Sequence, residues 1–192
     1  IGRAHTAQET IAAYQLAREA GFTDINMDLI AALPGETLED FRRTLETTVS
    51  LAPESVTVHA LAIKRSSRLH EQMHVQGGGH GLTPANEAEK MTALARKTLT
   101  DGGWKPYYLY RQKYMAGNLE NVGYARPGMA CLYNIGNMEE TASVLALGAG
   151  AITKWLFDRA RRIERAPNVK NIEAYIERVE EMAARKRELI FS

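Results

Sequence analysis

Residues 24–31 read DINMDLIA and residues 55–63 read SVTVHALAI, and these two short apolar stretches decide the fold. Both have the length and composition of buried β-strands. Between them, Phe41, Leu45 and Val49 keep the spacing of one helix face. A strand, a helix and a second strand joined by so long a crossover predict a parallel pair. The apolar character of both strand faces predicts a sheet covered on both sides.

Capping residues mark where two helices begin. Thr6 and Glu9 form a T-A-Q-E capping box, and a helix should follow to about residue 20. Thr37 and Asp40 mark the start of the helix between the two strands in the same way. The chain therefore opens with alternating helices and strands, which indicates the α/β class.

The character of the sequence changes after residue 64. Residues 64–84 are basic and then glycine-rich, which is typical of a mobile loop. Beyond this loop, the patterns predict a helix over 85–100, a strand over 105–114, a turn-rich segment over 116–128, a short strand over 130–136 and a charged helix over 171–188. We therefore expect a boundary in the loop and domains at residues 1–64 and 65–192.

The overall composition argues against several classes of partner and site. With 24 basic and 23 acidic residues, the net charge of +1 gives no reason to expect nucleic acid or an anionic membrane surface. No apolar run approaches the roughly 18 residues of a membrane span. The single cysteine, Cys131, cannot form an internal disulfide or hold an iron–sulfur cluster, and a reducing cytoplasm is the simplest location. His70 and His74 have the spacing of a metal pair but no third ligand, so we predict no metal site.

Several short segments, taken in order, carry a family resemblance. They are GRAHT at residues 2–6, AREAGF at 17–22, NMDLI at 26–30, LPGET at 33–37, SVTVHALAI at 55–63 and LGAGA at 147–151. Together they resemble the oxygen-independent coproporphyrinogen III oxidases of the radical S-adenosylmethionine (SAM) superfamily. The run YYLYRQKYMAGNLENVGYA at residues 107–125 resembles the Gram-positive-type branch, whose members are called coproporphyrinogen dehydrogenases.

The resemblance implies a fold for the chain. It implies the last strands and helices of a partial parallel β/α barrel, followed by a smaller α+β C-terminal domain. The family's C-x-x-x-C-x-x-C loop, which holds a [4Fe–4S] cluster, is absent, and the first residue is Ile1 rather than a methionine. We therefore expect a C-terminal fragment of a longer protein, inactive by itself.

The resemblance also implies a reaction. In such enzymes SAM and the cluster generate a 5′-deoxyadenosyl radical that takes a hydrogen atom from a propionate of coproporphyrinogen III. Loss of carbon dioxide and one electron leaves a vinyl group of protoporphyrinogen IX, in oxygen-independent haem biosynthesis. An electron donor and an electron acceptor are implied as partners. Some relatives resemble these oxidases but act as haem chaperones, and this alternative stays open.

Asp28 and Arg3 are the candidate residues for SAM. Asp28 lies on a predicted strand among apolar neighbours, where a carboxylate is costly unless it is paired. The resemblance implies that Asp28 accepts hydrogen bonds from the SAM ribose and that Arg3 grips the SAM carboxylate. The alternatives are a structural carboxylate and a solvent-exposed residue near the chain end.

Further residues are candidates for the adenine ring and for the substrate. Ala62 and Ile152 resemble family positions that border the adenine, although core packing explains both residue types. The substrate carries several propionates, so cations are needed near its cleft, and Arg111, Lys113 and Arg126 are the candidates. They alternate with tyrosines that could stack on a tetrapyrrole. A strand with one packed and one solvated face would show the same pattern.

Overall fold

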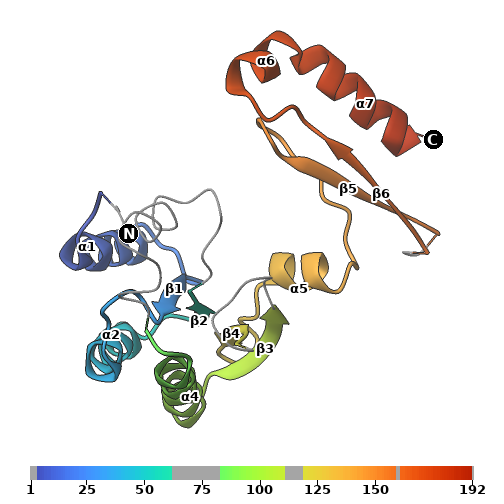
Figure 1. The fold of residues 1–192 in the computed structure, drawn as a ribbon. Coiled ribbons are helices and arrows are strands. Elements are labelled where there is room, and N and C mark those ends of the chain that lie inside the picture. The colour runs from blue at the N-terminus through green and yellow to red at the C-terminus, as the bar shows by residue number, and fades with distance from the viewer. Residues whose placement is uncertain (1–3, 62–82, 111–118, 159–160, 192) are drawn as a thin grey trace. The chain divides into compact units, whose positions relative to one another are not determined.

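The computed structural model describes residues 4–61, 83–110, 119–158 and 161–191. It divides into two compact units, Ile1–Cys131 and Leu132–Ser192 (Figure 1). The two strands that decide the fold both lie in the first unit.

The first unit is built on a four-stranded mixed sheet. Its elements in chain order are α1 (Ala7–Glu19), β1 (Asn26–Ala31), α2 (Leu38–Leu51), β2 (Ser55–Ala60), α4 (Ala85–Asp101), β3 (Lys105–Tyr110) and β4 (Asn121–Ala125). The strand order is β1-β2-β4-β3, with β1 parallel to β2 and the other neighbours antiparallel. The predicted α/β class and the predicted parallel pair are confirmed.

Both predicted capping boxes form. The Glu9 amide donates to the Thr6 hydroxyl at 3.2 Å, while the Thr6 amide donates to the Glu9 carboxylate at 2.7 Å. Thr37 and Asp40 make the same reciprocal pair at the start of α2. Each box satisfies two amides that a helix start leaves without partners, so local sequence sets where α1 and α2 begin.

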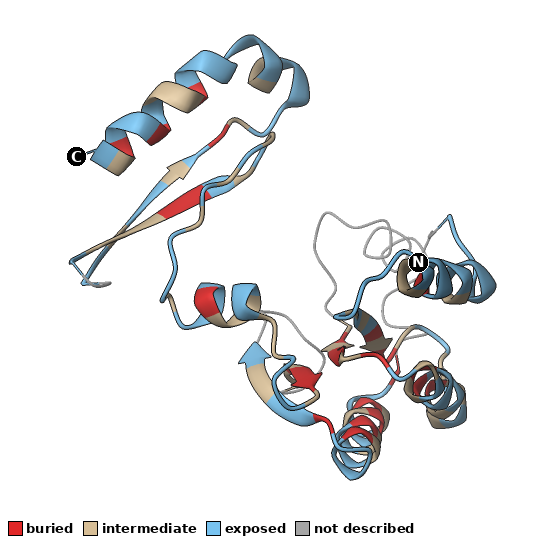
Figure 2. Cartoon of the chain, turned by 180° about the vertical axis from the view of Figure 1, so that it is seen from behind, coloured by how far each residue is buried: buried red, intermediate tan, exposed pale blue. Residues whose placement is uncertain are grey.

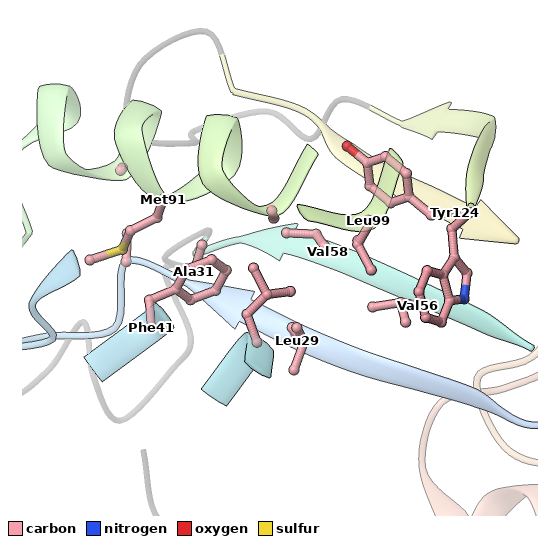
Figure 3. Close-up of a cluster of buried hydrophobic side chains, with 13 residues drawn as sticks. Leu29, Ala31, Phe41, Val56, Val58, Met91, Leu99 and Tyr124 are labelled. Atoms are coloured by element: carbon pink, nitrogen blue, oxygen red, sulfur yellow. The ribbon is translucent and has the colours of Figure 1, made fainter. Parts of the chain in front are cut away.

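One face of the sheet carries the hydrophobic core. Figure 3 shows Phe41 of α2 and Met91 of α4 beside side chains of β1 and β2, and Figure 2 shows the buried positions of the first unit gathered on these elements. Along β1, Leu29 is buried whereas Asn26 and Asp28 are exposed. The prediction that both faces of the sheet are covered is therefore wrong for β1. Within the described residues, only the face of β1 that carries Leu29 is covered.

A polar cluster ties α1 to the segment after α2. Nη2 of Arg18 donates to both carboxylate oxygens of Glu54 at 2.7 Å, and Glu54 also accepts from the Ile25 amide. The Tyr14 hydroxyl donates to the Leu51 carbonyl at 2.8 Å. Desolvation raises the pKa of Glu54, but the bonds from Arg18 and Ile25 outweigh it and the pKa is lowered. Ionised Glu54 therefore stabilises the fold above its unfolded pKa, and this contribution is lost as the pH falls through its lowered folded pKa.

The later part of the first unit differs from the prediction. Residues 121–125 lie within the predicted turn-rich segment, but they form β4, which pairs with both β2 and β3. Because β4 completes the sheet that β1 and β2 begin, the units divide after residue 131 and not at the predicted boundary near residue 64. Long-range pairing outweighs the local turn preference of Gly and Asn here. The predicted loop over 64–84 falls largely outside the described residues.

Among its described residues, the second unit contains an antiparallel hairpin and three helices. They are α5 (Leu132–Met138), β5 (Ile152–Phe157), β6 (Arg162–Pro167), α6 (Ile172–Glu177) and α7 (Val179–Phe191). The predicted strand over 130–136 is wrong, because α5 is helical, and the predicted single helix over 171–188 is two helices that break at Arg178. Across the described ranges, no helix has the length and apolar character to cross a bilayer.

Replacing Ala52 with glycine is expected to raise the free energy of unfolding by about 0.5–1 kcal/mol. Ala52 ends α2 in the left-handed region, with φ 54° and ψ 52°, and its side chain is exposed, so glycine removes strain without removing packing. The control is Ala20→Gly at the end of α1, where φ is −73° and glycine should destabilise instead. Urea unfolding measures both changes, and a less stable Ala52→Gly variant would contradict this expectation.

Candidate functional site

Asp28 lies on the face of β1 opposite the core. Nδ2 of Asn26 donates to Oδ1 of Asp28 at 2.6 Å, and Nε2 of His59 lies 3.6 Å from Oδ2. The Asp28 side chain is 61% exposed, so the expectation of a buried carboxylate is wrong. Its interaction with His59 is the main cause that lowers the pKa of Asp28, and partial desolvation opposes it. Asp28 therefore stays ionised, held from both sides and open to a ligand.

The strand register places Asp28 in a row with one residue from each strand. Asp28 of β1 lies opposite Thr57 of β2, which lies opposite Gly123 of β4. Gly123 in turn lies opposite Tyr108 of β3. Burial is the main cause that raises the pKa of Tyr108. The interaction of its hydroxyl with that of Thr57 lowers this pKa, and the charge of Asp28 raises it. The row therefore links the polar face of β1 with the far strand of the sheet.

Three polar neighbours of Asp28 were not predicted as site residues. Besides His59, they are Asn26 and Thr57, which share a hydrogen bond of 3.1 Å. Period-2 alternation in the sequence puts Asn26 on the same strand face as Asp28, and Thr57 on the same face as His59. Which face of the second strand meets Asp28 depends on the register, and sequence alternation does not specify it.

A cleft of about 490 Å³ adjoins Asp28, between α1, β1 and α2. Its volume lies within the range of about 300–1,000 Å³ that is usual for small-molecule pockets. Aliphatic side chains such as Ile11 and Leu51 and several threonines line it, and Arg43, which also lines it, is bonded to Asp40. Space for part of a ligand therefore exists beside the carboxylate.

Arg126, predicted to bind the substrate, is held by neighbours in the first unit. Its guanidinium carbon lies 3.6 Å from the centroid of the Trp104 ring, and its Nη1 donates to the Gly102 carbonyl at 2.9 Å. The Arg126 amide donates to the Glu54 carbonyl at 2.8 Å. These contacts account for the residue without a ligand, and its contact with the substrate stays a prediction.

The LGAGA segment is held by neighbours in the second unit. The Gly148 amide donates to the Tyr175 hydroxyl at 3.1 Å, and the Asn168 side chain donates to the Gly148 carbonyl at 2.7 Å. Gly148 and Gly150 have φ values of 97° and 73°, which only glycine adopts readily. Ile152, just after this turn, is 52% exposed, so core packing does not explain it within its unit. Its predicted contact with adenine stays a prediction.

The remaining predicted site residues lie outside the described residues. They are Arg3, Ala62, Arg111 and Lys113. Where positions are described, no group of three or more His, Cys, Asp or Glu side chains could hold a metal ion, and His70 and His74 fall outside those positions. Since Cys131 is the single cysteine of the chain, the residues present do not fit a [4Fe–4S] cluster.

Comparison with known proteins gives a consistent set of relatives. No family model matches the chain. It is 43% identical to the oxygen-independent coproporphyrinogen-III oxidase-like protein HemZ of Bacillus subtilis, over 94% of this chain and 35% of that protein. It is 26% identical to the heme chaperone HemW of Bacillus subtilis, over 79% of this chain and 36% of that protein. The solved structure of coproporphyrinogen III oxidase (HemN) from Escherichia coli, a radical SAM enzyme, matches with a TM-score of 0.64 and 22% identity, over 92% of this chain and 39% of that chain.

These matches agree with the fold and with the segments read from the sequence. The structural match confirms the mixed α/β class. The chain spans about a third of the length of the curated relatives named above. The similarity to HemZ extends over nearly the whole chain. In sequence, the chain is therefore similar to oxygen-independent coproporphyrinogen-III oxidase-like proteins.

Proposed function

We propose that this chain is part of a radical SAM enzyme that oxidatively decarboxylates propionate groups of coproporphyrinogen III to vinyl groups in oxygen-independent haem biosynthesis. The 43% identity to HemZ supports this proposal, as does 27% identity over 110 residues to coproporphyrinogen III oxidase, anaerobic 1, of Cereibacter sphaeroides. The proposal includes SAM and a [4Fe–4S] cluster as cofactors, an electron donor and an electron acceptor as partners, and a cytoplasmic location.

The exposed, ionised carboxylate of Asp28 carries the SAM part of the proposal. A ribose presents two adjacent hydroxyls, and each can donate to one carboxylate oxygen. Asn26 and His59 hold the carboxylate from either side, and its exposure leaves acceptor sites free. SAM, when bound, supplies the adenosyl group that accepts a hydrogen atom in this class of reaction, and the role of Asp28 is to hold and orient the ribose.

Asp28→Asn in the complete, cluster-loaded protein is expected to weaken SAM binding by about tenfold to 100-fold, because a hydrogen bond to a charged group is worth about 1.5–3 kcal/mol. Asp24→Asn is the matched control, since it makes the same change of charge at an exposed position before β1. Anaerobic equilibrium dialysis measures SAM affinity, and visible absorbance measures cluster content. Equal SAM affinity in Asp28→Asn and the wild type, with the cluster intact, would remove the SAM assignment.

A haem chaperone without this reaction is the second candidate function. It is favoured by 26% identity to the heme chaperone HemW of Haemophilus influenzae and of Escherichia coli, as well as that of Bacillus subtilis. Anaerobic incubation of the complete protein with coproporphyrinogen III, SAM and a reductant separates the two. Release of carbon dioxide with a vinyl product supports the oxidase, whereas stable haem binding without turnover supports the chaperone.

A further inference from the structure

A β-bulge brings two tyrosine rings onto the sheet face that carries Asp28. The pairing of β3 with β4 shifts register between Pro106 and Tyr108, which makes Tyr107 the extra residue. The rings of Tyr107 and Tyr108 meet edge to face, with centroids 4.9 Å apart and an interplanar angle of 65°. In a regular strand two neighbouring side chains point to opposite faces, so the bulge is what brings these rings together.

Gly123 provides the space for this tyrosine pair. A Cβ at position 123 would lie 2.0 Å from Cε1 of Tyr108 and 3.0 Å from Cε1 of Tyr107. Both rings therefore occupy the space directly over β4, next to Thr57 in the row that begins at Asp28. Both tyrosines are only half-buried, so part of the aromatic surface remains open.

The proposed reaction requires that the substrate lie beside the ribose that Asp28 holds. This inference rests on the proposed function. A hydrogen atom passes from the substrate to C5′ of the ribose only when the reacting atoms lie about 3–3.5 Å apart. If Asp28 holds the ribose, the substrate lies against the same sheet face. Neighbouring strands are about 4.8 Å apart, so a tetrapyrrole placed there extends across β2 toward β4. The next aromatic surface in that direction along the row is the tyrosine pair.

We propose that Tyr107 and Tyr108 form a wall that packs against the flat face of a pyrrole ring of the tetrapyrrole substrate. Aromatic side chains bind such rings in offset or edge-to-face geometry, and two rings at an angle offer both a face and an edge. One ring is enough to cover a glycine in a strand. The bulge adds the ring of Tyr107, which meets the ring of Tyr108 edge to face.

Tyr108→Leu is expected to weaken binding of coproporphyrinogen III to the complete protein by about threefold to tenfold, with SAM affinity unchanged. Gly123→Ala keeps both tyrosines but displaces the Tyr108 ring, and it is expected to have the same effect. Tyr133→Leu is the matched control, because the Tyr133 side chain in α5 is 65% exposed. Anaerobic equilibrium dialysis measures the affinity for each ligand, and Tm is recorded for every variant.

Three results with Tyr108→Leu would overturn the tyrosine wall. Unchanged affinity for both ligands would leave the ring as a structural cover for Gly123. Weaker SAM binding with unchanged coproporphyrinogen III binding would assign the ring to adenine. An equal loss of both affinities with a lowered Tm would show general disruption of the sheet.

The variant Asp28→Asn keeps this proposal separate from the proposed function. If Asp28→Asn leaves SAM affinity unchanged, the SAM assignment fails whatever Tyr108 shows. If Asp28→Asn weakens SAM binding while Tyr108→Leu leaves coproporphyrinogen III affinity unchanged, the tyrosine wall alone fails.

Discussion

Replacing Phe41 with alanine is expected to lower the free energy of unfolding of the first unit by about 3–5 kcal/mol. Phe41 of α2 is 0% exposed, and Figure 3 shows it between the strands and Met91 of α4. Alanine loses the transfer free energy of the ring and leaves a cavity. Because two helices and two strands bound that cavity, it cannot collapse without moving the backbone of the sheet layer.

Urea unfolding followed by tryptophan fluorescence measures the effect at Phe41. Trp104 belongs to the same core and Trp155 to the other unit, so the full chain in a Trp155→Phe background reports on the first unit. Phe22→Ala is the control, since Phe22 is 62% exposed and its removal should change stability by less than about 0.5 kcal/mol. Equal losses in the two variants would contradict the assignment of Phe41 to the core.

Replacing Trp104 with alanine is expected to cost a similar amount, about 3–5 kcal/mol, because three interactions disappear together. Trp104 is 2% exposed, and its indole Nε1 donates to the Pro53 carbonyl at 3.0 Å. The Arg126 guanidinium lies over the ring at 3.6 Å. Alanine therefore leaves a cavity, a buried carbonyl without its donor and a guanidinium without its aromatic surface.

Trp104→Phe separates these contributions. Phenylalanine keeps most of the apolar volume and an aromatic face for Arg126 but has no N–H for the Pro53 carbonyl, so a loss of about 1–2 kcal/mol is expected. Urea unfolding followed by circular dichroism measures both variants. If phenylalanine costs as much as alanine, the hydrogen bond and not the cavity dominates.

The same residues show why the surroundings of a cation cannot be read from sequence. The sequence predicts that Arg126 binds the substrate, because basic residues and tyrosines are interleaved near it. In the fold, its guanidinium meets Trp104 and the Gly102 carbonyl, which come just after α4. No local pattern links Arg126 with Trp104. The antiparallel pairing of β3 with β4 places Lys105 opposite Ala125, and this pairing brings their neighbours Trp104 and Arg126 together.

Local interactions explain the elements that the sequence predicted correctly. The capping boxes at Thr6 and Thr37 involve residues three apart, so their geometry depends little on the rest of the chain. The parallel pair of β1 and β2 follows from the helical crossover between them. In contrast, the segment 130–136 is short and apolar, which suits a strand as well as a helix. In the structure most of it belongs to the helix α5.

By itself, the sequence determined the α/β order of the first elements and the position of Asp28 on the strand face opposite Leu29, because capping and period-2 alternation act between near neighbours. Only the tertiary structure decided that Asp28 meets His59, that Gly123 and Tyr108 complete its row, and that a bulge adds Tyr107. These contacts depend on the register between strands far apart in the chain. Register is set by the packing of the whole sheet, and a one-residue shift would turn every side chain of a strand to the other face.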